Sequence, residues 1–165
     1  MIDGYGRTID YVRISVTDRC NLRCVYCMPE EGVGSISHEE ILRFGEIERV
    51  CQILAENGIQ KIKLTGGEPL VRRRLPELAA ALKRIPGIKS LTITTNGVLL
   101  EEMYDALADA GVDSVTISLD TLDASVYRQL TRRDEIEAVR RGLRTAIQKG
   151  RMQIKINCVP VLGIE

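Results

Sequence analysis

Apolar residues along this chain follow two alternating patterns. Short runs rich in Val, Ile, Leu and Thr are separated by longer segments in which apolar residues recur every three to four positions. The first pattern is typical of β-strands, and the second of helices with one buried face. We expect strands at residues 10–16, 60–66, 90–97, 113–120 and 153–163, and helices at residues 38–58, 74–87, 99–111, 124–130 and 135–149.

The first expected helix has a start signal and a stop signal. Ser37 and Glu40 have the spacing of a capping box, which predicts that the helix begins at residue 38. Asn57 and Gly58 are typical of a helix end. The predicted buried face consists of Ile47, Val50, Cys51 and Leu54.

Strands that alternate with helices predict an α/β fold with parallel strands and helical crossovers. An open barrel-like sheet and a flat doubly wound sheet both fit this pattern. Polar or Gly-rich groups follow the expected strands: "RCNLRC", "TGGEP", "TTNG" and "SLD". Because ligands bind at the carboxyl ends of parallel strands, we expect these groups to meet at one rim of the sheet.

Composition narrows the function classes. A length of 165 residues suits one domain, which we expect to span residues 1–165. Lys plus Arg and Asp plus Glu number 23 each, and aromatic residues make up only 4%, which argues against binding to nucleic acid or a membrane. No apolar run resembles a secretory signal or a membrane span, so we expect a cytoplasmic protein.

Three of the five cysteines lie close together, in a C-x3-C-x2-C pattern at Cys20, Cys24 and Cys27. In a reducing compartment such thiols indicate metal ligands. The spacing alone allows an iron–sulfur cluster, or a structural zinc with His38 as fourth ligand. Cys51 lies on the predicted helix face and Cys158 in a predicted strand, so we expect both to be core residues.

Residues 19–27 (RCNLRCVYC) and 65–69 (TGGEP) resemble the radical S-adenosylmethionine (SAM) superfamily. Further segments resemble one branch, the GTP 3′,8-cyclase family of molybdenum cofactor biosynthesis, in the order and spacing of that family. They are residues 13–29, 61–73, 91–100, 115–123 and 155–159. This resemblance implies a parallel β/α repeat that forms a partial, TIM-like barrel.

The resemblance also implies the cofactors. Cys20, Cys24 and Cys27 would hold a [4Fe–4S] cluster whose fourth iron is left open for the amino and carboxylate groups of SAM. Tyr26 matches an aromatic position that contacts SAM. The other matched SAM-binding positions are Gly66, Gly67, Glu68 and Ser118.

Three cations mark the expected substrate side. Arg13, Lys63 and Lys155 are each flanked by apolar residues in expected strands, so alternation puts them on the face opposite to the core. In a barrel-like sheet that face is the lumen, where a triphosphate would supply the counter-charge. Together with Thr94, they match the GTP-contacting positions of the family. Lys63 replaces an arginine there, which keeps the charge but loses the bidentate geometry.

The resemblance implies that a 5′-deoxyadenosyl radical removes the 3′ hydrogen of GTP, and that the sugar then attacks C8 of guanine to give (8S)-3′,8-cyclo-7,8-dihydroguanosine 5′-triphosphate. The family's second cluster lies in a C-terminal region without a counterpart in residues 1–165. We therefore expect this chain alone not to cyclise GTP. The resemblance further implies a homodimer and an electron donor that the sequence does not identify.

Two alternatives stay open. One is another radical SAM enzyme, such as a peptide-modifying enzyme. The other is a non-enzymatic metal-binding scaffold, which the zinc interpretation of the cysteines would favour.

Overall fold

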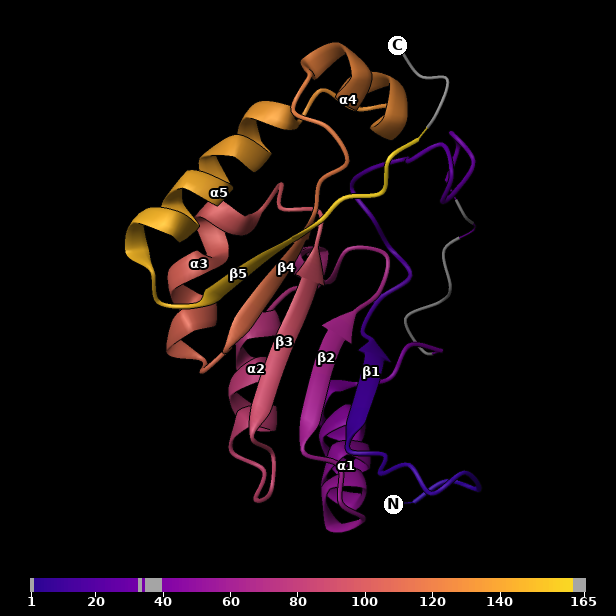
Figure 1. The fold of residues 1–165 in the computed structure, drawn as a ribbon, viewed down its shortest axis with the longest axis vertical. Coiled ribbons are helices and arrows are strands. Elements are labelled where there is room, and N and C mark those ends of the chain that lie inside the picture. Colours follow the sequence, from indigo (N-terminus) through magenta and orange to yellow (C-terminus); the bar gives the residue numbers. More distant parts are fainter. Residues whose placement is uncertain (1, 33, 35–39, 162–165) are drawn as a thin grey trace.

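The computed structural model describes residues 2–32, 34 and 40–161. Strands and helices alternate along this part of the chain, as the sequence predicts (Figure 1). No helix in it is long and apolar enough to cross a bilayer. The strands are β1 (Tyr11–Ser15), β2 (Lys61–Thr65), β3 (Ser90–Thr95), β4 (Ser114–Ser118) and β5 (Gln153–Asn157). The helices are α1 (Phe44–Glu56), the 3₁₀ helix η1 (Pro69–Val71), α2 (Leu75–Lys83), α3 (Leu100–Asp109), α4 (Ala124–Thr131) and α5 (Ile136–Lys149).

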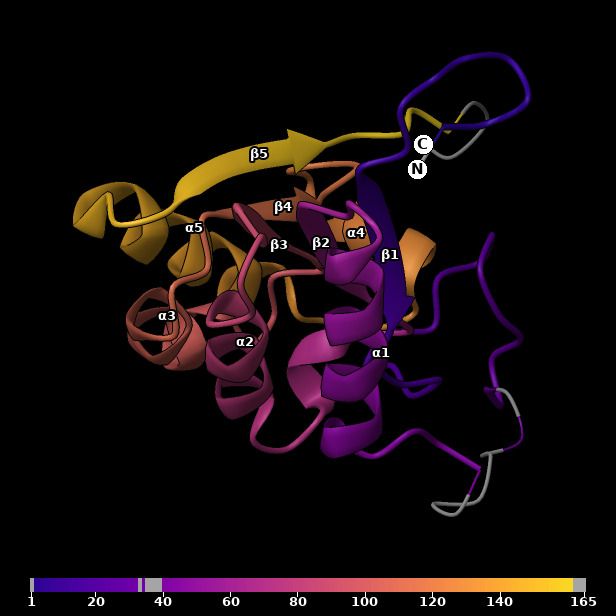
Figure 2. The ribbon, with the colours of Figure 1, turned by 90° about the horizontal axis from the view of Figure 1, so that it is seen from below.

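The strands form one parallel sheet in the order β1-β2-β3-β4-β5. Helices α1, α2, α3 and α5 lie on the same side of this sheet (Figure 2), and α4 lies beyond the carboxyl ends of the strands (Figure 1). A doubly wound sheet has helices on both faces, so of the two predicted architectures the structure favours the open barrel-like sheet. The sheet is not closed, because β1 and β5 stand at its two edges within the described residues.

Alternation along each strand separates two kinds of side chain. The apolar set faces the helices, and its central members are completely buried: Leu64, Leu91, Ile93, Val115 and Ile117 are each 0% exposed. Burying one such side chain stabilises the fold by about 1.5–3 kcal/mol. The residues between them are polar, as in the β3 sequence Ser-Leu-Thr-Ile-Thr-Thr. One face of the sheet is therefore the core, and the other is a polar surface that no helix of the described residues covers.

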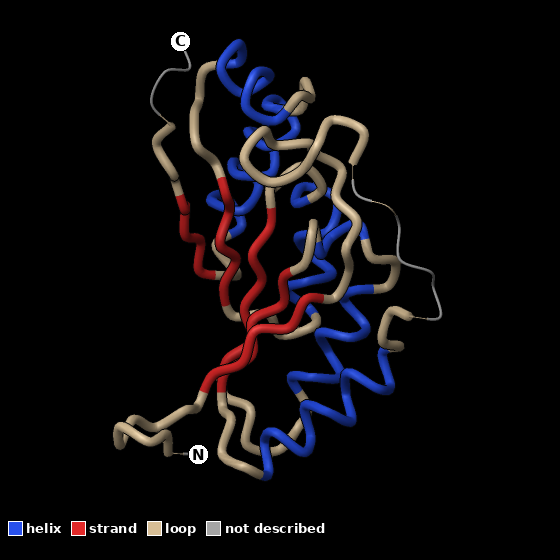
Figure 3. Tube along the Cα trace, turned by 90° about the vertical axis from the view of Figure 1, so that its right-hand side faces the viewer, coloured by secondary structure: helices blue, strands red, loops and turns tan. Residues whose placement is uncertain are grey.

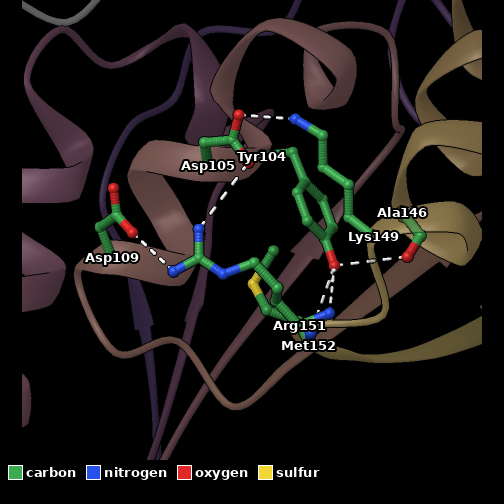
Figure 4. A network of polar contacts seen from close by, with 7 residues as sticks. All are labelled: Tyr104, Asp105, Asp109, Ala146, Lys149, Arg151 and Met152. Carbon is green, nitrogen blue, oxygen red and sulfur yellow. Dashed lines mark hydrogen bonds and ion pairs between the residues drawn. The ribbon is translucent and has the colours of Figure 1, made fainter.

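The edge strand β5 is fixed at its start by a polar network on α3 and α5 (Figure 4). The Tyr104 hydroxyl is buried, accepts hydrogen bonds from the Arg151 and Met152 amides at 2.9 and 3.2 Å, and donates to the Ala146 carbonyl at 3.3 Å. Around it, two ion pairs join Lys149 to Asp105 and Arg151 to Asp109, each at 2.6 Å. These contacts set where β5 enters the sheet.

The predicted start of the first helix is wrong. Ser37 lies outside the described residues, and Glu40 is in a turn, so the helix begins six residues later than predicted, at Phe44 rather than 38. The observed cap uses a different acid: the Arg43 amide donates to Glu46 Oε2 at 2.6 Å. Glu46 thus has the role that the capping-box prediction gives to Glu40, since it satisfies the amide of the residue that precedes the helix.

Two predictions about the fifth strand and its cysteine need correction. The strand ends at Asn157, whose carbonyl accepts from the Leu119 amide at 3.0 Å, and Pro160 has no amide with which to continue the ladder. Cys158 is therefore beyond the strand and exposed, not in the core. Cys51 is confirmed as a core residue, because it is 0% exposed on α1.

Candidate functional site

The loops that follow the strands gather at one end of the sheet (Figure 3). The longest of them in this region carries the three cysteines, and we name its described start, residues 16–32, the cysteine loop. It begins as a continuation of the pairing between β1 and β2, because the Val16 amide donates to the Thr65 carbonyl at 2.8 Å. The Gly67 and Glu68 amides then donate to the Thr17 and Arg19 carbonyls, both at 2.8 Å. The cysteine loop and the "TGGEP" segment thus form one paired unit.

This pairing explains the two glycines. A Cβ atom at Gly66 would clash with the Thr17 carbonyl oxygen, and one at Gly67 would clash with the Arg19 carbonyl oxygen. The backbone of the cysteine loop therefore needs both glycines for its close approach to the end of β2. Their predicted contact with SAM stays a prediction.

Glu68 joins the ends of β2 and β3. Its side chain is 1% exposed and accepts three hydrogen bonds, from Thr95 Oγ1 and the Asn96 amide at 2.6 Å each and from the Leu70 amide at 3.0 Å. Burial raises the pKa of this carboxyl above its ordinary value, although these donors oppose the shift. The carboxyl is therefore already occupied within the protein, and any contact with a SAM ammonium would be an additional one.

Asn96, directly after β3, connects this unit to the first cysteine. Its side-chain amide donates to Asn21 Oδ1 at 2.7 Å and lies 3.9 Å from the sulfur of Cys20. The Leu22 amide approaches the same sulfur at 3.4 Å. Hydrogen bonds to a ligand sulfur orient it and stabilise its thiolate, as outer-shell groups do in metal sites.

The three cysteines are free thiols on one loop. Cys20 and Cys24 are half-buried and Cys27 is exposed, and the turn between the last two is closed by a bond from the Cys27 amide to the Cys24 carbonyl at 2.9 Å. Burial raises the pKa of the Cys20 and Cys24 thiols, and the neighbouring thiols add to the shift. All three thiols thus belong to the cysteine loop, at the same end of the sheet.

These residues fit an iron–sulfur cluster by their chemistry. Soft thiolates are the usual ligands of such clusters, and a bound cation would stabilise the thiolate forms that burial disfavours. In the described part of the chain, no three His, Cys, Asp or Glu side chains are arranged to hold a single metal ion. His38, the fourth ligand in the zinc interpretation, lies outside the described residues.

Tyr26 extends from the cysteine loop to the end of β4. Its hydroxyl donates to Asp120 Oδ2 at 2.5 Å, and burial followed by this bond raises the pKa of the phenol. The loop is also tied to α4, since the Val25 amide donates to the Leu130 carbonyl at 2.9 Å. Beneath these contacts lies a cavity of about 40 Å³ whose lining includes Cys24, Tyr26, Asn96, Ser118, Asp120 and Tyr127.

The polar face of the sheet brings the predicted cations together. Arg13 and Lys63 are paired in the register of β1 and β2. Burial lowers the pKa of the Lys63 ammonium, and Arg13 and Lys155 lower it further. No ion pair within the described residues involves any of these three side chains. The result is a concentration of positive charge without a counter-ion among the described residues.

Thr94 lies on the same face. It pairs in register with Thr116, which in turn pairs with Lys155. Its hydroxyl oxygen is buried and has no hydrogen-bond partner among the described residues. A buried hydroxyl without a partner costs about 1–3 kcal/mol, so it marks a place where a ligand atom would be stabilising.

Sequence reasoning missed three residues of this rim. Asn96 and Asp120 belong to the polar groups "TTNG" and "SLD", so their position after a strand was the available signal. Tyr127 had no such signal, because an aromatic residue on a helix is usually a core residue. It is 4% exposed, and its hydroxyl has no partner in the described structure.

Comparison with known proteins gives a consistent picture. The family model of the Radical SAM superfamily matches residues 14–165. The chain is 48% identical over 164 residues to a GTP 3′,8-cyclase of Petrotoga mobilis, covering 99% of this chain and 51% of that protein. It is 52% identical over 163 residues to a GTP 3′,8-cyclase of Pelotomaculum thermopropionicum, covering 99% and 50%. The chain thus spans about half the length of these relatives.

Among solved structures, anSMEcpe with bound AdoMet has a TM-score of 0.70 at 21% identity, covering 90% of this chain and 43% of that chain. Streptococcus suis SuiB bound to S-adenosylmethionine has a TM-score of 0.70 at 22% identity, covering 90% and 32%. At these identities the likeness shows the fold alone. It supports the predicted partial barrel.

Proposed function

The chain belongs to the radical SAM superfamily, and from this premise we propose that it is the SAM-binding part of a GTP 3′,8-cyclase. The observation that carries the proposal is the juxtaposition of two features on one sheet. A three-cysteine loop lies at the carboxyl ends of the strands, and an uncompensated cationic surface lies on the polar face of the same strands. The high identity to named GTP 3′,8-cyclases supports the choice of substrate.

Cys20, Cys24 and Cys27 would hold the [4Fe–4S] cluster, which when bound and reduced supplies one electron for the cleavage of SAM. Three thiol ligands leave one iron for SAM itself. The remaining residues position these ligands: Asn96 donates toward Cys20, and the glycine pair lets the cysteine loop approach β2. Tyr26 and Ser118 line the same small cavity as Cys24, so both lie beside a proposed cluster ligand.

Arg13, Lys63 and Lys155 would bind the triphosphate of GTP. A triphosphate supplies the negative charge that these side chains lack within the described protein. Thr94 would donate or accept one further hydrogen bond through its unpartnered hydroxyl. We propose that GTP is held against the polar face in this way, next to the rim where SAM binds. The homodimer and the electron donor implied by the resemblance stay predictions.

The test begins with anaerobic reconstitution of the 165-residue chain with iron and sulfide. We expect a reduced protein whose EPR spectrum changes when SAM is added, and no cluster in a Cys24→Ala variant. GTP affinity is then measured, and a Lys155→Met variant is expected to bind GTP about tenfold more weakly, as the loss of roughly 1.4 kcal/mol predicts.

Each alternative has its own outcome. A protein that responds to SAM but does not bind GTP would be another radical SAM enzyme, such as one that modifies peptides. A protein that retains zinc and assembles no cluster would be a metal-binding scaffold. Either result would overturn the proposal.

A further inference from the structure

The structure assigns a positioning role to Asp120: this carboxylate fixes Tyr26 of the cysteine loop against the ends of β4 and β5, and thereby shapes the SAM site before SAM binds. The inference rests on the proposed function for the identity of the ligand. The contacts of Asp120 do not depend on the proposed function, because they exist in the ligand-free protein.

The two oxygens of the Asp120 carboxylate hold different segments. Oδ2 accepts the hydroxyl of Tyr26 at 2.5 Å, and Oδ1 accepts the backbone amide of Val159 at 2.9 Å. Tyr26 is 94 residues away from Asp120 in sequence. A single side chain therefore joins the loop after β1 to the segment after β5, across three intervening strands of the sheet order.

The backbone around Asp120 is held firmly enough to serve as the fixed end of this connection. Before it, the Leu119 amide donates to the Asn157 carbonyl at 3.0 Å. Its own carbonyl oxygen accepts from the Cys158 thiol at 3.5 Å. Both bonds tie the end of β4 to the end of β5, so the carboxylate projects from a backbone that two strands support.

Tyr26, by contrast, needs such a partner. Its side chain is 57% exposed on a loop, so without the bond to Asp120 the ring would be free to change rotamer. The ring stands between Cys24 and Cys27 in sequence and lines the same cavity as Cys24 and Ser118. Holding the ring in place in advance lowers the entropy cost of binding a ligand beside it.

The chemistry of a carboxylate suits this double task. It is an acceptor at both oxygens, so it can receive a phenol and an amide at the same time, and the hydrogen bond to an ionised acceptor is stronger than one between neutral groups. An alanine at this position would remove the side-chain hydrogen bonds to both segments. Removal of the Tyr26 hydroxyl alone would remove only the bond to the loop.

The experiment compares Tyr26→Phe, Asp120→Ala and the double variant, with Asp134→Ala as control. Asp134 is an exposed carboxylate whose ion pair with Arg128 does not involve the loop, so the control removes the same charge elsewhere. SAM affinity is measured on the cluster-reconstituted chain, and iron content is measured alongside it. Amide hydrogen exchange is measured on the cluster-free chain.

We expect each single variant to bind SAM about five- to tenfold more weakly, which corresponds to one hydrogen bond of roughly 1–1.4 kcal/mol. The double variant should be no weaker than Asp120→Ala alone, because the same bond is lost in both. Iron content should stay at the wild-type level. Exchange at the Cys27 and Met28 amides should be faster in both single variants, and exchange at the Val159 amide only in Asp120→Ala.

Additive losses of SAM affinity in the double variant would overturn the inference, because they would show that the two residues act separately. Unchanged exchange at Cys27 and Met28 in both single variants would also overturn it. If the wild-type chain itself fails to bind SAM, the proposed function fails, and the exchange data still decide whether Asp120 positions Tyr26.

Discussion

Glu68 is a carboxylate that folding removes almost completely from water. Burial of this kind is tolerated when donors surround the group, and here a hydroxyl and two backbone amides do so. The donors come from η1 and from the end of β3, so the side chain fixes the geometry of the rim between two strands. Its role in the ligand-free protein is structural.

We predict that Glu68→Gln lowers the free energy of unfolding by about 1–3 kcal/mol, the cost of leaving a buried polar group without a partner. An amide group in place of the carboxylate presents an NH₂ to groups that are themselves donors. Urea unfolding of the wild type and the variant measures the difference. Glu102→Gln, on the exposed side of α3, should change it by less than about 0.5 kcal/mol; equal losses in both variants would contradict the prediction.

The burial of Glu68 should also make the free energy of unfolding depend on pH. Because the pKa of Glu68 is raised in the folded state, the folded chain binds this proton more tightly than the unfolded chain does. The contribution is fully present below the ordinary value of 4.5 and is lost as the pH rises through the raised value. We predict that wild-type stability, measured by urea unfolding, falls across this window and that Glu68→Gln removes this part of the fall. Parallel pH profiles for the two proteins would disprove the prediction.

Tyr127 presents the opposite case, a buried hydroxyl without a partner in the described structure. Its removal leaves no other group unsatisfied. We predict that Tyr127→Phe leaves the melting temperature of the ligand-free chain unchanged or raises it by a few degrees, as a gain of about 1 kcal/mol would do for a chain of this size. A clear fall in the melting temperature would show that the hydroxyl has a partner in solution.

For single residues, the sequence did not reveal which groups lie next to them in the folded chain. The resemblance gives Gly66 and Gly67 as SAM-binding positions, and the structure adds a different reason for these glycines, the close approach of the cysteine-loop backbone. A sequence pattern shows that a Cβ is excluded without showing what excludes it. Similarly, the contact between Tyr26 and Asp120 joins residues on different strand ends, and only the register of the sheet brings them together.

At the scale of elements, the alternation of short apolar runs and amphipathic segments was enough to place every strand and α-helix to within a few residues, except at two ends. The start of α1 was misplaced because the capping-box spacing of Ser37 and Glu40 pointed to residue 38, whereas the acid that accepts from the amide at the helix start is Glu46. The end of β5 was misplaced because the apolar run continues past the last ladder bond. The hydrophobic pattern predicts where an element lies and which side of it is buried. Hydrogen bonding decides at which residue the element ends.

Tyr104 shows how one side chain can set the position of an element. Its hydroxyl accepts two amides that precede β5, and these would lack this partner in a Tyr104→Phe variant. We predict a loss of about 1–3 kcal/mol in unfolding free energy and faster hydrogen exchange at the Arg151 and Met152 amides. Arg151→Ala serves as control, since it removes exposed ion pairs and should cost less than about 1 kcal/mol. A larger loss of unfolding free energy in Arg151→Ala than in Tyr104→Phe would contradict the prediction, because it would show that the ion pairs contribute more to stability than the hydroxyl does.

At the scale of the whole molecule, the polar face of the sheet is the feature that links fold to function. In a sheet covered by helices on both sides, Arg13, Lys63 and Lys155 would be buried charges without partners. Here α1, α2, α3 and α5 all lie on the opposite side of the sheet, so these cations remain accessible to a ligand (Figure 2). The sequence predicted that the charges share a face, but the one-sided arrangement of helices came from packing and was not visible in the pattern.

This arrangement implies that the cations lower the stability of the ligand-free chain while they favour GTP binding. Lys63 is the residue on which this can be tested. Burial and two neighbouring cations disfavour its charge in the ligand-free chain. We predict that Lys63→Met raises the urea midpoint of the ligand-free chain and weakens GTP binding by about tenfold, with the affinity difference becoming smaller at high salt. Such an exchange of stability against function is common at binding sites.

Lys61→Met is the matched control for this conflict. Lys61 lies on the same strand and the same face, but it is exposed and already paired with Asp10 at 2.8 Å. Its loss should leave the urea midpoint unchanged or slightly lower, and it should weaken GTP binding less than the loss of Lys63 does. If Lys63→Met destabilises the chain as well as weakening binding, Lys63 has a counter-ion in solution and the polar face is not an uncompensated cationic surface. If both variants weaken binding equally, the effect is one of net charge, and the site does not depend on where the cations stand.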